Sequence, residues 1–182
     1  MKKFEEKTIQ SQPIFNGKVI SLKLDDVTLP NGETSKREIV NHPGAVAVIA
    51  ITTDNKIILV EQYRKALERS IIEIPAGKLE KGEMPEMTAR RELEEETGYG
   101  CNELTYLQSF ATSPGFADEV IHLFVARGLY KIEESAAMDE DEFVELLEVS
   151  LEEAEQMVAE QKIYDAKTAF AVLWLKINLA SM

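Results

Sequence analysis

Apolar and polar positions along the chain predict strands interleaved with helices. Residues 45–51 form the longest apolar run, which predicts a buried strand, and residues 56–63 predict its partner after a turn at Asp54-Asn55. Residues 85–97 are good helix formers, with proline at a tolerated first-turn position and Gly98 where a helix is expected to stop. This segment therefore predicts a helix.

The rest of the chain continues the same mixture. Further strands are predicted at residues 68–75, 104–110, 120–127 and 143–149, and helices at residues 151–161 and 165–179. The polar, acidic segment 133–142 predicts a mobile loop. Strands alternating with helices, some joined by hairpins, indicate the α/β class, with a mixed sheet and helices on its faces.

The first part of the chain has a different pattern. Residues 8–41 indicate β structure, and Asn31-Gly32 predicts a tight hairpin turn because this pair supplies positive φ angles. A break follows at His42-Pro43-Gly44, and the chain beyond it is more apolar. We therefore predict a small N-terminal β subdomain at residues 1–42 and a main domain at residues 43–182.

Composition narrows the class of protein. The chain has 182 residues, of which 45% are hydrophobic and 29% charged, which suits one compact domain with a small appendage. A formal charge of −13 argues against a general nucleic-acid surface, and a single cysteine excludes an internal disulfide framework and a cysteine-built metal site. No apolar run could cross a bilayer and the first residues do not resemble a signal peptide, so we expect a soluble cytoplasmic protein.

Glutamates gather on one face of the predicted helix. Glu92, Glu95 and Glu96 stand at positions i, i+3 and i+4, so their side chains share a face, while Glu94 points elsewhere. Each like-charge pair at this spacing costs about 0.2–0.5 kcal/mol in water. One explanation is an ordinary solvated acidic face. The other is a site for a hard divalent cation, to which the nearby loop Pro75-Ala76-Gly77 could add carbonyl oxygens.

This region resembles a complete Nudix box. Each fixed position of that family's pattern is occupied, by Gly77, Glu83, Arg91, Glu92, Glu95, Glu96 and Gly98, with Leu93 and Tyr99 at its hydrophobic places. Chance agreement at so many spaced positions is very improbable. The resemblance implies the Nudix fold, an α/β/α sandwich, and hydrolysis of a nucleoside diphosphate linked to another group.

The same resemblance implies roles for residues of the box. It assigns the binding of Mg²⁺, with Mn²⁺ as an alternative, to three carboxylates and one backbone carbonyl, those of Glu92, Glu95, Glu96 and Ala76. Glu95 is also a candidate catalytic residue. Glu83 and Arg91 are expected mainly to orient the other side chains.

Features outside the box resemble the ADP-ribose pyrophosphatase branch of the family. Pro114 lies 16 residues beyond Gly98, and Gln62-Tyr63-Arg64 resembles the branch's arginine-bearing strand end. Arg37-Glu38 before the break resembles its N-terminal domain. The resemblance implies hydrolysis of ADP-ribose to AMP and ribose 5-phosphate. The residues that it implies for substrate binding are Arg37, Glu38, Arg64, Pro114 and Glu119, the last at the terminal ribose.

Several further expectations follow from the resemblance. The acidic run before Phe143 matches a region that supplies a general base in relatives, and Glu140 is the first candidate and Glu142 the second. A homodimer formed through the N-terminal segment is expected, as in the family. Three alternatives stay open. The first is a Nudix enzyme for another nucleoside diphosphate derivative, such as a sugar nucleotide or a dinucleoside polyphosphate. The second is a non-catalytic Nudix module that senses a nucleotide, and the third is a structural or interaction protein with a solvated glutamate helix.

Overall fold

The structure, a computed structural model, describes residues 3–133 and 143–179. The strands in chain order are β1 (Lys7–Asn16), β2 (Ser21–Thr28), β3 (Thr34–Asn41), β4 (Ala45–Ile51), β5 (Ile57–Arg64), β6 (Arg69–Glu73), β7 (Ala76–Lys78), β8 (Tyr99–Ala111), β9 (Val120–Lys131) and β10 (Val144–Val149). The helices are α1 (Pro85–Thr97), α2 (Leu151–Ala159) and α3 (Ala166–Leu179).

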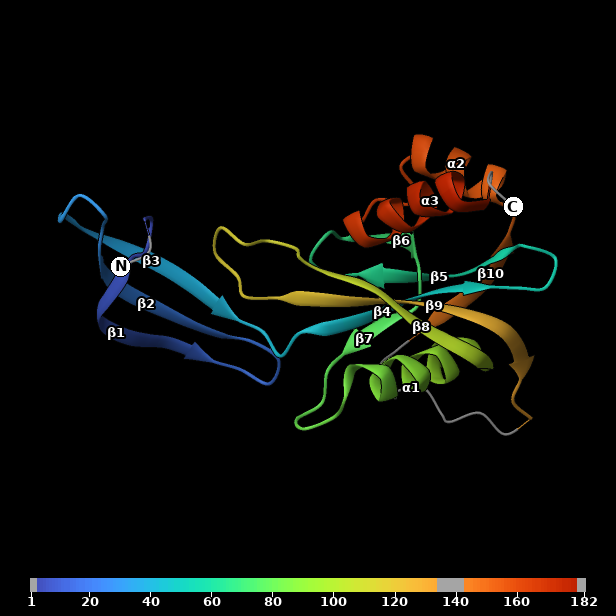
Figure 1. Cartoon of the computed structure of the whole chain (residues 1–182), viewed down its shortest axis with the longest axis horizontal. Coiled ribbons are helices and arrows are strands. Elements are labelled where there is room, and N and C mark those ends of the chain that lie inside the picture. Colours follow the sequence, from blue (N-terminus) through green and yellow to red (C-terminus); the bar gives the residue numbers. More distant parts are fainter. Residues whose placement is uncertain (1–2, 134–142, 180–182) are drawn as a thin grey trace. The chain divides into compact units, whose positions relative to one another are not determined.

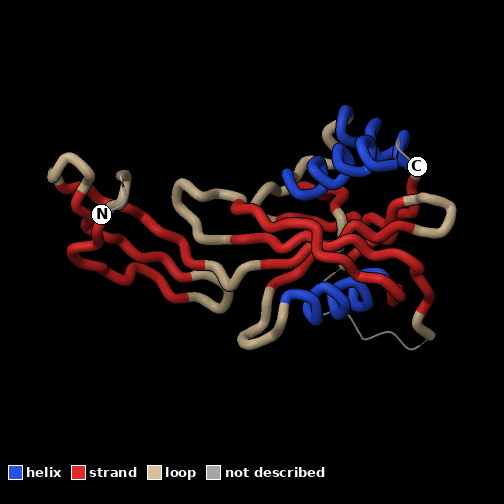
Figure 2. The backbone as a smooth tube through the Cα atoms, in the orientation of Figure 1, coloured by secondary structure: helices blue, strands red, loops and turns tan. Residues whose placement is uncertain are grey.

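The chain divides into two compact units. One comprises Met1–Gly44 together with Phe110–Ile121, and the other comprises Ala45–Ser109 together with His122–Met182. The described residues of the first unit form strands and loops (Figure 2), with β1, β2 and β3 in an antiparallel sheet in that order. A backbone bridge between Val40 and Ala117 joins this sheet to the Phe110–Ile121 segment.

The predicted turn at Asn31-Gly32 is present, but its type differs from the expectation. The Gly32 N–H donates to the Leu29 carbonyl at 2.9 Å, and the Leu29 N–H donates to the Glu33 carbonyl at 2.7 Å. Gly32 has a φ of 89°, whereas Asn31 has no positive φ. The loop is therefore a three-residue turn closed by one left-handed glycine, and the expectation that both residues supply positive φ angles was wrong.

The second unit is an α/β/α sandwich, which confirms the predicted fold class. Its sheet has the order β10-β5-β4-β9-β8, with β6 beside β5 and β7 beside β4. Helix α1 covers one face, and α2 and α3 cover the other (Figure 1). Strand β4 is buried along its whole length because helices cover both faces of the sheet. This double burial explains why its sequence is continuously apolar rather than alternating.

Helix α1 has the predicted bounds. Pro85 occupies its first turn, and Gly98 ends it in the left-handed conformation with φ of 69° while its N–H donates to the Glu94 carbonyl at 2.7 Å. Its apolar face packs on the sheet through Ala89 and Leu93, which are both fully buried against the side chains of β4. Pro85 and Gly98 thus define the two ends of α1, and the burial of Ala89 and Leu93 determines which face of the helix packs on the sheet.

Some strands are longer than their sequence pattern indicates. Strands β8 and β9 run beyond the predicted segments at 104–110 and 120–127, since the pairing continues through polar and exposed residues at their ends. The loop predicted at 133–142 lies almost wholly outside the described residues. No helix in the described ranges has the length and apolar character needed to span a membrane.

Candidate active site

The candidate site lies where α1 packs closely against β7. Strand β7 pairs with β4, with Gly77 opposite Val46. A Cβ atom added to Gly77 would lie only 1.8 Å from the carboxyl carbon of Glu92. The absence of a side chain at this position therefore allows the Glu92 carboxylate to lie against the β7 backbone, and a larger residue would displace it.

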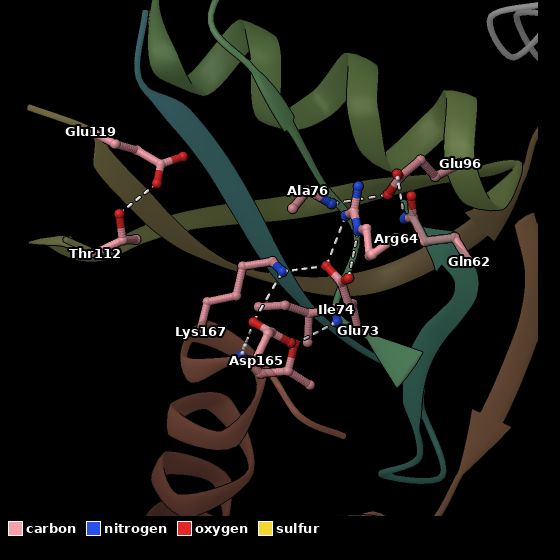
Figure 3. Close-up of polar contacts among 11 residues, drawn as sticks. Gln62, Arg64, Glu73, Ile74, Ala76, Glu96, Thr112, Glu119, Asp165 and Lys167 are labelled. Carbon is pink, nitrogen blue, oxygen red and sulfur yellow. Dashed lines mark hydrogen bonds and ion pairs between the residues drawn. The ribbon is translucent and has the colours of Figure 1, made fainter. Parts of the chain in front are cut away.

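Glu96 is joined to the same strand by a hydrogen bond. The Ala76 N–H donates to Glu96 Oε2 at 2.9 Å, and the Gln62 side-chain amide donates to Glu96 Oε1 at 3.4 Å (Figure 3). Glu92 and Glu96 are each only 8% exposed. Two of the three glutamates on this helical face are therefore buried at the junction with β7, which is not the arrangement of an ordinary solvated face.

Arg91 links the glutamates of the helix. Its Nη1 donates to Glu92 at 2.9 Å and to Glu95 at 2.8 Å, and its Nη2 donates to Glu83 at 3.2 Å. Burial alone would lower the pKa of Arg91, but the three carboxylates outweigh it and raise this pKa above its ordinary value. Thr88 Oγ1 also donates to Glu83 at 2.8 Å, so this carboxylate is held by Thr88 as well as by Arg91. One positive charge faces three carboxylates here, so negative charge predominates among these four side chains.

The donor types suit a hard divalent ion. Carboxylate oxygens of the box and backbone oxygens of the adjoining strand are the ligands that Mg²⁺ and Mn²⁺ prefer. Among residues 3–133 and 143–179, no three His, Cys, Asp or Glu side chains already stand together as a metal cluster. The contacts explain this, because Glu92 and Glu95 bond to Arg91 while Glu96 bonds to the Ala76 amide. Gathering their oxygens around one ion requires rotation of these side chains.

Arg64, the predicted diphosphate contact on β5, is held by a carboxylate on the neighbouring strand. Its Nε and Nη2 donate to the two oxygens of Glu73 at 2.7 and 2.8 Å (Figure 3). Lys167 Nζ lies 2.5 Å from Glu73 and 3.0 Å from Asp165. Burial would raise the pKa of Glu73, but the hydrogen bonds from Arg64 and Lys167 outweigh it and place this pKa below its ordinary value.

The other predicted substrate residues belong to the first unit. Arg37 forms an ion pair with Glu6 at 2.6 Å, and its neighbour Glu38 is exposed on β3. Glu119 accepts a hydrogen bond from the Thr112 hydroxyl at 2.5 Å (Figure 3). Pro114 lies in the turn that precedes it.

Comparison with known proteins identifies the family. Residues 41–169 match the family model described as NUDIX domain. The chain belongs to the Nudix family. Residues 6–40 match a second model, described as the N-terminal domain of nucleoside diphosphate sugar hydrolases. The chain is therefore a Nudix hydrolase, and membership of the family implies the use of a divalent metal ion.

Two curated relatives match almost the whole Nudix chain. It is 66% identical to a methanol dehydrogenase activator of Bacillus methanolicus, over 98% of this chain and 97% of the relative. It is 61% identical to an ADP-ribose pyrophosphatase of Bacillus subtilis (strain 168), over 99% of this chain and 97% of the relative. A crystal structure titled ADP compounds hydrolase superposes with a TM-score of 0.82 at 24% identity, covering 94% of this chain and 95% of that one, and confirms the Nudix fold.

The structure brings together the box residues but does not describe the predicted general base. Ala76, Glu92 and Glu96 meet where β7 contacts α1, and Glu95 joins them through Arg91. Glu140 and Glu142 lie outside the described residues, so their assignment stays a prediction.

Sequence reasoning missed two charged residues beside the Nudix site, Glu73 and Lys167. Glu73 interrupts an apolar segment, between Ile72 and Ile74, and an isolated charge in such a segment indicates a paired, buried group. That signal was available. Lys167 had no comparable signal, because its partner lies on a strand far away in the chain.

The ionised form of Glu73 makes the stability of the protein depend on pH. Because its folded-state pKa is below the ordinary value of 4.5, Glu73 stabilises the fold above that pH, and this contribution is lost as the pH falls through the folded-state pKa. We expect Glu73→Gln to lower the free energy of unfolding at pH 7 and to flatten its decline below pH 4.5. One proton accounts for a slope of about 1.4 kcal/mol per pH unit at most.

Urea denaturation from pH 7 down to pH 3 measures both quantities. Glu61→Gln on the same unit is the control, since Glu61 has no buried ion pair among the described contacts. Parallel pH profiles for the wild type and Glu73→Gln would contradict the assignment.

Proposed function

We propose that this Nudix hydrolase converts ADP-ribose and water to AMP and ribose 5-phosphate in the presence of Mg²⁺. The observation that carries the proposal is the burial of Glu92 and Glu96 of the box against Ala76 and Gly77, which builds an oxygen-lined junction where a divalent ion can bind. The near full-length similarity to the ADP-ribose pyrophosphatase of Bacillus subtilis supports this choice of substrate.

The proposed metal ligands are the carboxylates of Glu92, Glu95 and Glu96 with the Ala76 carbonyl. Mn²⁺ would substitute for Mg²⁺, since both prefer oxygen ligands. The ion would lower the pKa of the attacking water and offset charge on the diphosphate. Arg91 would hold Glu92 and Glu95 in place from one side, and Gln62 with the Ala76 amide would hold Glu96 from the other.

Arginines are the proposed diphosphate contacts, because a planar guanidinium can donate two parallel hydrogen bonds to phosphate oxygens. Arg64 uses its Nε and Nη2 for Glu73, and its side chain is 40% exposed, which keeps another edge accessible to substrate. Arg37 is the second proposed contact. Glu38, Pro114 and Glu119 are proposed to contact the rest of the substrate, with Glu119 at the terminal ribose.

The first prediction for this function is metal-dependent cleavage of ADP-ribose. With Mg²⁺ or Mn²⁺ the wild type should release AMP and ribose 5-phosphate. Glu95→Gln and Glu96→Gln should each lower kcat by several orders of magnitude, because each removes a ligand of the ion, which stabilises the charge of the transition state by several kcal/mol. The control is Glu94→Gln on the same helix. Turnover unchanged in both ligand variants would contradict the metal site, and near-normal kcat in both Glu140→Gln and Glu142→Gln would exclude them as the base.

The same assay separates the alternatives. Values of kcat/KM across ADP-ribose, sugar nucleotides and dinucleoside polyphosphates identify the preferred substrate, and products formed in ¹⁸O-labelled water identify the bond that is cleaved. A higher kcat/KM for a sugar nucleotide would overturn the substrate assignment. An absence of turnover with any of them, despite tight nucleotide binding, would support a sensing module.

A second candidate function is activation of a methanol dehydrogenase. The observation that favours it is the 66% identity to the activator of Bacillus methanolicus. Because the match covers 98% of this chain, we expect added protein and Mg²⁺ to raise the rate of methanol oxidation by such a dehydrogenase, and Glu96→Gln to abolish the increase. An equal increase with Glu96→Gln would mean that activation does not need hydrolysis.

We also propose that the protein is a homodimer formed through its N-terminal unit. Every residue of β1 is exposed, including the large apolar side chains of Ile9, Ile14 and Phe15, each more than half exposed. A three-stranded sheet with such an edge is expected to be covered by another surface.

Light scattering at micromolar concentration should show a dimer. Ile14→Asp should dissociate this dimer, whereas Leu173→Asp on α3 should leave it intact. A wild-type monomer would contradict the proposal.

A further inference from the structure

Glu73 is a buried charge with an unusual setting. It is 2% exposed and lies at the end of β6, and its neighbours Ile71, Ile72 and Ile74 are buried apolar residues. A carboxylate in such surroundings is costly unless charged partners satisfy it. Both of its partners are cations, and one of them, Arg64, is the proposed diphosphate contact.

The contact with Arg64 fixes the plane of the guanidinium. Two parallel hydrogen bonds, from Nε and Nη2 to separate oxygens of Glu73, restrict rotation about the last bonds of the arginine side chain. The Nη1 group lies on the other edge. Glu96 of the box also contributes to the elevated pKa of Arg64, after Glu73 as the main cause, which indicates that the guanidinium lies within electrostatic reach of Glu96.

Lys167 also holds Glu73, at the same oxygen, Oε2, that accepts from Arg64 Nη2. It is 9% exposed, comes from the first turn of α3, and contacts both Glu73 and Asp165. Asp165 in turn accepts the Thr168 N–H at 3.1 Å, which fixes the start of α3. A continuous row of ion pairs thus runs from α3 through Glu73 to Arg64, and its two acidic and two basic groups balance in charge.

We propose that Glu73, fixed by Lys167, is a positioning residue that presents the free edge of Arg64 to the diphosphate of the substrate. The inference rests on the proposed function and adds two residues that do not belong to the Nudix box. Substrate binding gains when an arginine is already ordered, because the cost of ordering its side chain is met during folding. Lys167, through its ion pair with Glu73, is thereby coupled to substrate affinity.

The test is a double-mutant cycle on the full-length protein. Glu73→Gln keeps the size of the side chain but cannot accept both hydrogen bonds, and Arg64→Ala removes the group that it positions. We expect Glu73→Gln to raise KM for ADP-ribose by about 10- to 100-fold, by analogy with the loss of a hydrogen-bond partner from a metal ligand, with a smaller change in kcat. In the Arg64→Ala background the same substitution should change kcat/KM by less than about 2-fold, because coupled residues are not additive.

Two further variants separate positioning from stability. Lys167→Met should raise KM in the same direction, and Lys167→Arg should restore it because the ion pair is retained. Thr168→Val is the matched control: the Thr168 hydroxyl accepts the Ile74 N–H at 3.0 Å and ties α3 to the end of β6 without contacting Arg64. It should lower the melting temperature, as Glu73→Gln does, while KM stays at the wild-type value.

The outcomes distinguish this inference from the proposed function. If the wild type cleaves ADP-ribose but the losses from Glu73→Gln and Arg64→Ala are additive, Glu73 does not act through Arg64 and the inference is overturned. An equal rise in KM for Thr168→Val overturns it too, since the effect would then come from the docking of α3. If the wild type cleaves no nucleoside diphosphate, the proposed function itself fails.

Discussion

Repulsion among carboxylates on a single helical face is the constraint around which the second unit is arranged. Glu92, Glu95 and Glu96 lie on α1 at spacings that bring their charges together, and two of them are buried. An isolated helix would not favour this arrangement, particularly near its C-terminus. The fold maintains this arrangement in two ways. The Arg91 guanidinium bonds to Glu92 and Glu95, and the Ala76 N–H donates to Glu96. A divalent cation would relieve what repulsion remains.

The architecture of the sheet makes this arrangement possible. Strand β4 is covered on both faces, so α1 can pack closely on it and on β7, and Gly77 removes the one side chain that would hold α1 away from β7. On the other face, α3 reaches the site through Lys167 and Glu73. Residues from both helical layers thus converge on the strand ends that carry Arg64 and Ala76, and the stability of the core and the geometry of the site depend on the same contacts.

The sequence predicted the parts of the structure that depend on local chemistry. The bounds of α1 follow from Pro85 and Gly98, and the buried strand at 45–51 follows from its apolar run. The acidic box residues could be placed on one face from helical spacing alone. The pairing of Arg64 with Glu73 could not, because it depends on the register of β5 and β6, and the contact with Lys167 depends on how α3 docks. The type of the turn at Asn31-Gly32 was predicted wrongly, because loop length depends on the pairing of the flanking strands.

The most direct test of the account is crystallographic. Crystals of the wild type grown with Mn²⁺ and a non-hydrolysable ADP-ribose analogue should show anomalous density between the carboxylates of Glu92, Glu95 and Glu96 and the Ala76 carbonyl, with the diphosphate beside it. Absence of metal density at that junction while the analogue is bound, or density at a different set of oxygens, would contradict the claim that these glutamates are gathered to hold a divalent ion.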